Sequence, residues 1–266
     1  MEWLKALQEK LAAIGLNVMG VADGSPYAHL LEGCESAVVV GNGGRTLWEY
    51  FVQTLEEDPS RLSEHSHPFD DMVERWIEKI SVDVGLKQGE HFRWIRCAAT
   101  EETFVDFRCL GRDAGLGSSS PVGLLIHPEY GLWFGLRAVL LTTEKLDAHW
   151  LHNHPKPTLN VEGGAESPCS RCVEKPCISA CPAKAVQVEG WSVQRCATFH
   201  QTSSDCAGRC HSRLACPVGR EHRHSALQHL YHNDPVYGRR VLAATLGLQD
   251  VGEGTALDWE KWSGNR

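Results

Sequence analysis

The chain has 266 residues, of which 42% are hydrophobic and 23% charged, and its net charge is −8. This composition predicts a globular protein with a substantial core. No apolar run approaches the roughly 18 residues of a membrane-spanning helix, and the first 20 residues lack the basic head and apolar stretch of a signal peptide. We therefore expect a cytoplasmic protein without a membrane partner, whose eleven cysteines do not form a disulfide framework.

The first half of the chain predicts two amphipathic helices and one buried strand. Leu4, Leu7, Leu11 and Ile14 recur at helical spacing near the N-terminus. The run "SAVVVG" at 36–41 predicts a short buried strand. A second helix is predicted within 67–85, on a stripe formed by Met72, Trp76, Ile77, Ile80 and Val84, with Pro68 suited to its first turn and Gly85 to its end.

Two apolar runs, 122–126 and 132–143, are separated by a short loop that contains glycine. Their composition predicts a hairpin deep in a sheet. The segment 152–168 follows, with three prolines and a glycine pair, and is typical of a linker.

Eight of the eleven cysteines fall between residues 169 and 216 and form two motifs. The first is Cys169-x2-Cys172-x4-Cys177-x3-Cys181-Pro182, and the second is Cys196-x9-Cys206-x3-Cys210-x5-Cys216-Pro217. Two-cluster ferredoxins carry a similar motif twice, and the fourth cysteine of each run serves the other cluster. The pattern therefore predicts two [4Fe–4S] clusters.

The crossed arrangement assigns Cys169, Cys172, Cys177 and Cys216 to one cluster. The other is assigned Cys181, Cys196, Cys206 and Cys210, in a looser motif. Structural zinc also accepts four thiolates and is the competing interpretation, although it gives no reason for the proline after each half. Cys34, Cys97 and Cys109 precede this region, and we expect them to be buried apolar filler.

Arg137 interrupts an apolar run, and an unpaired buried charge is prohibitive. It must meet a carboxylate of the protein or a bound cofactor or substrate. The stretch "AGLGSSS" at 114–120 offers backbone amides and hydroxyls, so Gly117 and Ser118 are candidates for binding a polar ligand. An ordinary turn explains this stretch equally well.

The segment "DAGLGSSSPVGLLIHPEYGLWFGLRAVLLT" resembles the region that precedes the double [4Fe–4S] domain in epoxyqueuosine reductases. The stretches "IHPEYGLWFGLRAVLL" and "HPFDDMVERWIEKI" resemble CblC-type cobalamin-processing proteins still more closely. Reductive dehalogenases share the iron–sulfur domain. The resemblance covers roughly residues 1–220, and its specific motifs lie at 67–80, 114–142 and 169–217. It implies cobalamin binding in a nitroreductase-related fold, and in CblC-type proteins an arginine placed like Arg137 is associated with the thiol cosubstrate. We expect Arg137, Gly117 and Ser118 to be cofactor-binding residues.

Departures from these families limit the comparison. The catalytic aspartate of epoxyqueuosine reductases aligns with Glu101 when no gap is allowed, and with Glu102 or Asp106 otherwise. We expect neither the helical-repeat extension that helps those enzymes bind tRNA nor the twin-arginine signal that respiratory dehalogenases usually carry. No Asp-x-His-x-x-Gly pattern occurs, and we expect the histidines at 152–154 and 221–232 to lie in the linker and on the surface.

We therefore expect an α+β protein with two domains. A nitroreductase-like, corrinoid-binding domain with a mixed sheet covers residues 1–155, and a linker covers 156–168. A ferredoxin-like domain with two [4Fe–4S] clusters covers 169–235, and a C-terminal tail covers 236–266.

The expected function is that of an oxidoreductase in which the clusters pass electrons to cobalamin. The electrons would either remove a ligand from cobalamin itself or reduce a small organic substrate. Glu101 is expected to be the catalytic acid.

The expected partners are a flavodoxin or ferredoxin as electron donor and a corrinoid or other small molecule as substrate. Residues 169–240 carry ten Lys and Arg against five Asp and Glu, a basic segment suited to an acidic donor. The overall charge disfavours a nucleic-acid partner, although this segment keeps tRNA open. The alternatives are an electron-transfer protein without a corrinoid and a flavin-dependent reductase that binds FMN.

Overall fold

The computed structural model describes residues 2–64, 66–96, 103–147, 167–203, 206 and 208–248. Its largest sheet has the strand order β1-β2-β6-β3, and every neighbouring pair is antiparallel. The strands are β1 (Val18–Asp23), β2 (Ser36–Gly43), β3 (Phe92–Arg96) and β6 (Phe134–Thr142). Val139 lies opposite Val39 on one side and Ile95 on the other, which makes β6 a central strand.

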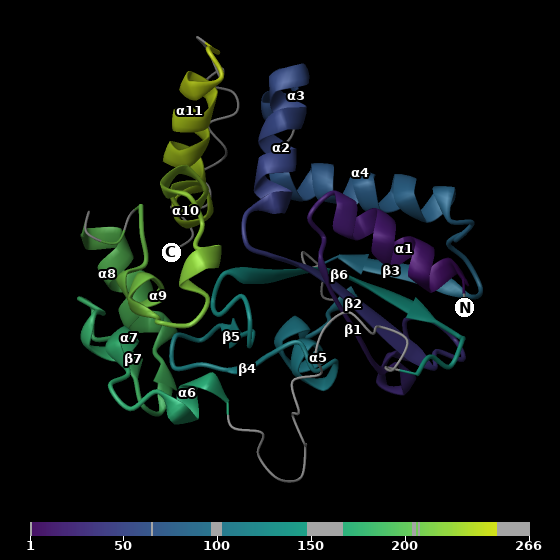
Figure 1. Cartoon of the computed structure of the whole chain (residues 1–266), viewed down its shortest axis with the longest axis horizontal. Helices are drawn as coiled ribbons and strands as arrows, with labels where there is room; N and C mark the ends of the chain where they lie inside the picture. The colour runs from purple at the N-terminus through teal and green to yellow at the C-terminus, as the bar shows by residue number, and fades with distance from the viewer. Residues whose placement is uncertain are drawn as a thin grey trace.

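Helices cover both faces of this sheet, as Figure 1 shows. Helices α1 (Glu2–Ala13), α2 (Thr46–Glu57) and α4 (Pro68–Asp83) bury their apolar stripes on the face that carries Val38 and Val40. The opposite face, with Val39 and Val139, packs against α5 (Phe107–Asp113). Successive valine side chains of β2 therefore point to opposite faces of the sheet and pack in two separate cores.

Three elements expected from the sequence are confirmed. The helix at the N-terminus buries Leu4, Leu7 and Leu11. The strand at 36–41 is part of β2. The helix expected within 67–85 is α4, and its first residue is Pro68, whose missing N–H is harmless there.

The predicted hairpin between the two apolar runs is wrong. Strand β5 (Leu125–Ile126) pairs with β4 (Ser118–Ser119) in a separate small sheet, whereas β6 pairs with β2 and β3. A turn closed by a bridge between His127 and Gly131 separates them. The expected mixed sheet also differs from the structure, because among the described residues every strand pair is antiparallel.

The cysteine-rich part forms a second lobe of short elements. It contains α6 (Pro168–Arg171), α7 (Pro176–Ser179), β7 (Val186–Gln187), β8 (Gly190–Trp191), α8 (Val193–Thr202) and α9 (His211–Ala215). Its apolar core is small and includes Val122, Ile126 and Leu132 from the first lobe together with Val186 and Cys216. The lobe thus shares its core with the sheet lobe.

The chain then returns to the sheet lobe through α10 (Ala226–Asn233) and α11 (Pro235–Thr245). Tyr231, Leu242 and Ala243 are buried in the same core as α1, α2 and α4. The segment expected as a tail from residue 236 therefore begins as a packed helix. Shorter elements of the described residues include α3 (Arg61–Glu64) and the 3₁₀ turns η1 (Ser25–Tyr27) and η5 (Arg220–His222).

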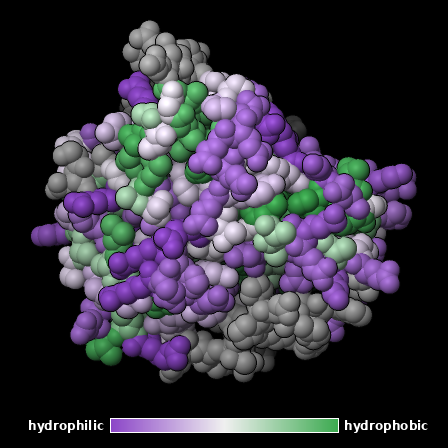
Figure 2. Space-filling model, turned by 45° about the horizontal axis from the view of Figure 1, so that its top comes forward, coloured by the Kyte–Doolittle hydropathy of each residue, from purple (hydrophilic) through white to green (hydrophobic). Residues whose placement is uncertain are grey.

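The surface turned to the viewer in Figure 2 is predominantly hydrophilic, with hydrophobic residues gathered in small patches. Within the described residues, no helix is long and apolar enough to cross a membrane.

The two lobes touch through backbone at a pair of glycines. Gly131, at φ +59°, faces the backbone of Val218, and Gly219, at φ +67°, faces the backbone of Tyr130. A Cβ on either residue would collide with main-chain atoms that have no flexible end to move aside. Both the positive φ and the close approach therefore require glycine here.

Gly131→Ala is expected to destabilise the protein by about 1–3 kcal/mol more than Gly115→Ala does. Gly115 has a similar φ of +71°, but a Cβ added to it would meet no atom within 4 Å, so it controls for backbone strain alone. Denaturant unfolding of the two variants measures the difference. Equal losses would mean that the close contact between the lobes contributes nothing.

Candidate functional site

Four cysteines from three segments line one small pocket. Cys169 lies in α6, Cys172 directly after it, Cys177 in α7 and Cys216 directly after α9. The pocket has a volume of about 20 Å³ and is completed by side chains of both lobes, among them Pro121, Ile126, Lys175 and Val218. These are the four cysteines that the sequence assigns to one cluster.

Local structure explains how two of these thiols reach the pocket. Ser167 caps α6 by accepting a hydrogen bond from the backbone of Cys169 at 3.2 Å, with Pro168 in the first turn. Lys175 adopts a left-handed conformation before α7, and its Nζ donates to the Cys169 carbonyl at 2.9 Å. The lysine thus ties the turn between the two short helices and brings a positive charge beside the thiols.

Burial raises the pKa of the Cys169, Cys177 and Cys216 thiols, and neighbouring cysteines raise it further. Such a group of thiols becomes anionic readily only when a positive centre lies among them. Within the described residues, no three His, Cys, Asp or Glu side chains form a group that could hold a metal ion as they stand. A four-thiolate site here would therefore have to close around an ion or open around a larger inorganic group.

The second set is less compact. Cys210 lies directly before α9, and Cys196 in α8 is close enough for its charge to raise the Cys210 pKa, although burial is the larger cause. Cys181 packs against the same apolar core as Cys169 and Cys177, and its Sγ accepts a hydrogen bond from Ala185 at 3.4 Å. Cys206 is half-buried. The structure thus brings Cys196 and Cys210 together within this set.

The three earlier cysteines have different surroundings. Cys34 is buried in the core of the sheet lobe, as expected. Cys109 is half-buried, and its Sγ lies 3.2 Å from an Asp106 carboxylate oxygen and 3.0 Å from an Arg112 nitrogen, so it is not apolar filler. Cys97 lies outside the described residues.

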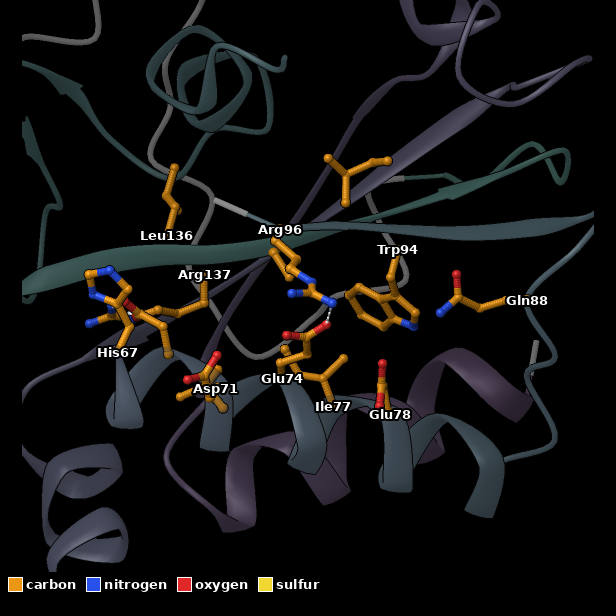
Figure 3. A pocket seen from close by; sticks show the side chains of 14 residues that line it. His67, Asp71, Glu74, Ile77, Glu78, Gln88, Trp94, Arg96, Leu136 and Arg137 are labelled. Atoms are coloured by element: carbon orange, nitrogen blue, oxygen red, sulfur yellow. Dashed lines mark hydrogen bonds and ion pairs between the residues drawn. The ribbon is translucent and has the colours of Figure 1, made fainter. Parts of the chain in front are cut away.

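A cavity of about 650 Å³ lies between α4 and the strands β3 and β6 (Figure 3). Four carboxylates from α4 line it, together with Arg96, Arg137 and Trp94. The carboxylates belong to Asp70, Asp71, Glu74 and Glu78. A cavity of this size lies within the usual range of about 300–1,000 Å³ for small-molecule sites.

Arg137 reaches this cavity because of a bulge in β6. Val40 and Gly41 are consecutive on β2 but lie opposite Ala138 and Leu136, so Arg137 is the extra residue between them. A bulge redirects the side chain of the extra residue. The Arg137 Nε donates to Asn42 Oδ1 at 2.8 Å, and its guanidinium lies 4.8 Å from the centre of the Phe69 ring.

Arg137 pairs with a carboxylate, one of the two partners predicted from the sequence, because its Nη1 lies 3.5 Å from Asp70 Oδ1. The Asp70 side chain is 60% exposed and that of Arg137 only 19%, so the ion pair is solvent-screened on one side. Pairing with a protein carboxylate therefore does not prevent Arg137 from contacting a bound ligand, because its guanidinium still lines the cavity.

The other charged pair of the cavity joins Arg96 at the end of β3 to Glu74 on α4 (Figure 3). Burial raises the pKa of Glu74, and Arg96 only partly opposes this effect. Glu74 is thus a carboxyl group in the cavity that holds its proton more strongly than an exposed glutamate. Nothing in the sequence pattern singled it out, because it is one of several acids on an amphipathic helix.

The acids expected from the sequence have other positions. Glu101 and Glu102 lie outside the described residues. Asp106 caps α5, and its carboxylate accepts hydrogen bonds from the backbone of Cys109 and Arg108, contacts that lower its pKa. A carboxylate stabilised in this way is a poor proton donor.

Gly117 and Ser118 do not line the Arg137 cavity. Gly117 approaches the Ile126 carbonyl and the Phe134 ring, where a Cβ would be crowded. Ser118 Oγ lies 2.8 Å from Ser167 Oγ, next to the start of α6. This stretch thus connects the sheet lobe to the four-cysteine pocket.

A buried junction that the sequence did not predict lies between Cys210 and β6. Trp133 is fully buried, and its ring contacts His224 and His229 at centroid distances of 5.2 and 5.6 Å. The Arg213 guanidinium lies 4.7 Å from the centre of the same ring. His229 Nε2 accepts a hydrogen bond from the Cys210 backbone at 3.2 Å.

The histidines of this junction were expected on the surface, and for His229, which is 4% exposed, that expectation is wrong. Burial lowers the pKa of His224 to about 2, of His229 to about 4 and of His232 to about 3. The three imidazoles are therefore neutral near pH 7. The helical spacing of His229 and His232 on the inner side of α10 was the signal available in the sequence. His152 and His154 lie outside the described residues.

No family model matches the chain. Among curated proteins, the epoxyqueuosine reductase of Synechococcus sp. (strain CC9605) is 32% identical over 130 residues, which are 48% of this chain and 32% of that enzyme. The sequence match therefore spans about a third of the curated relative.

Three solved structures extend the comparison. The B12-trafficking protein CblC from C. elegans gives a TM-score of 0.58 at 13% identity, over 92% of this chain and 95% of that one. An epoxyqueuosine reductase with a tRNA-Tyr stem loop gives 0.54 at 16% identity, over 89% and 70%. The reductive dehalogenase NpRdhA with 3-bromo-4-hydroxybenzoic acid gives 0.51 at 18% identity, over 93% and 36%.

The chain shares the fold of these proteins. They are the three groups that the sequence motifs resemble, so the expected relationship is confirmed at the level of the fold.

Cys172→Ala is expected to remove about half of the iron bound after anaerobic reconstitution, because under the predicted assignment only one of the two clusters would lose a ligand. Cys109→Ala is the control, since Cys109 is half-buried but belongs to neither cysteine set. Iron, zinc and sulfide analysis of both variants gives the result. Unchanged iron in Cys172→Ala, or zinc in place of iron in the wild type, would contradict the assignment.

Proposed function

We propose that this protein is an iron–sulfur oxidoreductase whose two [4Fe–4S] clusters deliver electrons to a corrinoid bound in the Arg137 cavity. The observation that carries the proposal is the combination, in one chain, of a four-cysteine pocket and a ligand-sized cavity. The fold shared with proteins named as reductases and as a B12-trafficking protein supports it.

The cysteines suit iron–sulfur clusters by the chemistry of their donors. Cys169, Cys172, Cys177 and Cys216 line a pocket whose described lining contains no other sulfur or carboxylate ligand. The remaining four, Cys181, Cys196, Cys206 and Cys210, are proposed to hold the second cluster. Because the first pocket has a volume of only about 20 Å³, we expect the α6 and α7 turns to move apart when a cluster is bound. Bound clusters supply single electrons.

The Arg137 cavity suits a corrinoid by size and by the nature of its lining. Its four carboxylates can accept hydrogen bonds from the amide side chains of a corrin ring, while Arg137 and Arg96 can donate to carbonyl oxygens. Ile77, Trp94 and Leu136 offer apolar contact. When bound, a corrinoid supplies cobalt in a strongly reducing and nucleophilic state.

The protein's own residues bind, orient and protonate. Arg137 is held by Asn42 and Phe69, so its guanidinium keeps a fixed direction toward the ligand. Glu74 holds a proton at its carboxyl group beside Arg96, and Glu101 stays a candidate for the same role. An acid is needed because reductive removal of a ligand or reduction of an organic substrate leaves a group that takes up a proton.

The reaction class is reductive removal of a ligand from cobalamin itself or reduction of a small organic substrate by the bound corrinoid. Electrons would come from an external flavodoxin or ferredoxin that docks on the basic 169–240 segment, which contains ten Lys and Arg and five Asp and Glu. The site is proposed to work in the cytoplasm.

Action on tRNA is a second candidate, favoured by the basic segment and by the fold shared with an epoxyqueuosine reductase that holds a tRNA stem loop. It weakens our expectation that nucleic acid is not a partner. Retention on tRNA that falls steeply with salt would support it. A flavin-dependent reductase would instead bind FMN, and a simple electron carrier would bind neither FMN nor a corrinoid.

Arg137→Gln is expected to weaken hydroxocobalamin binding about tenfold or more, because it removes a charged hydrogen-bond donor from the cavity. Arg75→Gln serves as control, since Arg75 lies on α4 outside the cavity lining and pairs with Glu64 at 3.4 Å. A visible-spectrum titration under anaerobic conditions gives both affinities. Equal affinities in the two variants, or no binding by the wild type, would contradict the proposed site.

A further inference from the structure

A groove at the junction of the two lobes has no part in binding the clusters or the corrinoid. It has a volume of about 400 Å³ and is lined by α5 and the β4–β5 hairpin of the sheet lobe and by the β8–α8 segment of the cysteine lobe. Trp191 joins the two sides, because its ring packs so closely on Gly123 that a Cβ there would collide with it. We call this feature the Trp191 groove.

Three of the side chains that line the Trp191 groove are apolar and exposed. Leu124 is 42% exposed, Trp191 38% and Val193 60%. Exposed apolar side chains that gather in a concave surface with polar surroundings mark an interaction site. Trp and Arg, which dominate the binding energy of many protein interfaces, are both present in this lining.

The freely exposed charges around the groove are mainly basic. Arg108 and Arg112 line it and are exposed, and no carboxylate of the described residues lies within ion-pair distance of either. Arg195 is exposed on the first turn of α8. Of the two carboxylates in the lining, Asp106 is engaged in the cap of α5, which leaves Glu189. This balance of charge favours an acidic partner.

The β4–β5 hairpin forms a wall of both the Trp191 groove and the four-cysteine pocket. Pro121 and Ile126 line the pocket, whereas residues 123–125 between them line the groove. Ser120 holds this hairpin closed, because its backbone N–H and its hydroxyl donate to the Leu124 carbonyl at 3.1 and 2.7 Å. A molecule in the groove would therefore lie one hairpin away from the cysteines proposed to hold the first cluster.

We propose that the Trp191 groove is the docking site of the electron donor, an acidic protein that carries single electrons. This inference rests on the proposed function, because it needs a cluster in the four-cysteine pocket. A flavodoxin in its anionic hydroquinone form would give one electron to that cluster and become the neutral semiquinone, with no bond broken and no proton transferred. A small groove suffices, because transient electron-transfer complexes have small interfaces.

The test compares two substitutions at Val193, the exposed first residue of α8. Anaerobic stopped-flow absorbance records the reduction of the iron-loaded, full-length protein by flavodoxin hydroquinone at low salt. Val193→Glu is expected to slow this reduction about threefold or more, because it repels an acidic donor, whereas Val193→Lys is expected to match or exceed the wild-type rate. Glutamate suits a helix N-terminus better than lysine does, so a loss of stability would give the opposite order.

Trp191→Ala is expected to weaken the apparent affinity for flavodoxin about tenfold, because it removes the aromatic anchor of the groove. Tyr237→Ala is the matched control, since Tyr237 is 57% exposed on α11 and does not line the groove. All four variants are expected to keep the wild-type rate with dithionite, a small reductant that needs no docking site.

The outcomes separate docking from the presence of clusters. Equal flavodoxin rates in Val193→Glu and Val193→Lys, equal slowing by both reductants, or failure of flavodoxin and ferredoxin to reduce a wild type that dithionite reduces would overturn the inference and leave the proposed function standing. Variants that lose retention on tRNA but keep the wild-type flavodoxin rate would assign the groove to nucleic acid and would also overturn it. A wild type without iron–sulfur absorbance would overturn the proposed function itself.

Discussion

The arrangement of the two lobes depends on a backbone contact that only glycine permits. Gly131 and Gly219 bring the turn before β6 against the turn after Cys216, and a side chain on either would force the lobes apart. Trp133, two residues after Gly131, is fully buried against His224 and His229, which follow the second lobe in the chain. Gly131, Gly219 and Trp133 thus determine how far the cysteine sets lie from β6. This strand carries Arg137, four residues after Trp133.

This junction also explains how charge is distributed through the interior. Burial keeps three histidines neutral, and Arg137 and Arg213 carry positive charge near two of them, His224 and His232. Arg137 lines a cavity with four carboxylates, while Arg213 stacks on the Trp133 ring. In the proposed electron-transfer role, such fixed charges would stabilise added electrons without reorganising at each transfer.

The sequence predicted what depends on periodicity and spacing, and missed what depends on long-range packing. The helical stripes and the β2 valines identified their elements because alternation and the 3.6-residue period survive in the fold. The 122–143 hairpin failed because β6 finds better partners in β2 and β3, which are distant in sequence. Cys169, Cys172, Cys177 and Cys216 were grouped from spacing alone, and they share one pocket. The bulge that redirects Arg137 and the burial of His229 leave no local pattern to read.

The central claim is that electrons pass from the cysteine lobe to a corrinoid in the sheet lobe. The most direct measurement reduces the iron-loaded protein with limiting dithionite, removes the excess, and adds one equivalent of hydroxocobalamin under anaerobic conditions while the visible spectrum is recorded. Our account predicts that iron–sulfur absorbance returns as cobalt is reduced, with one electron lost by the clusters for each electron gained by cobalt. Clusters that remain reduced beside unchanged hydroxocobalamin would contradict it.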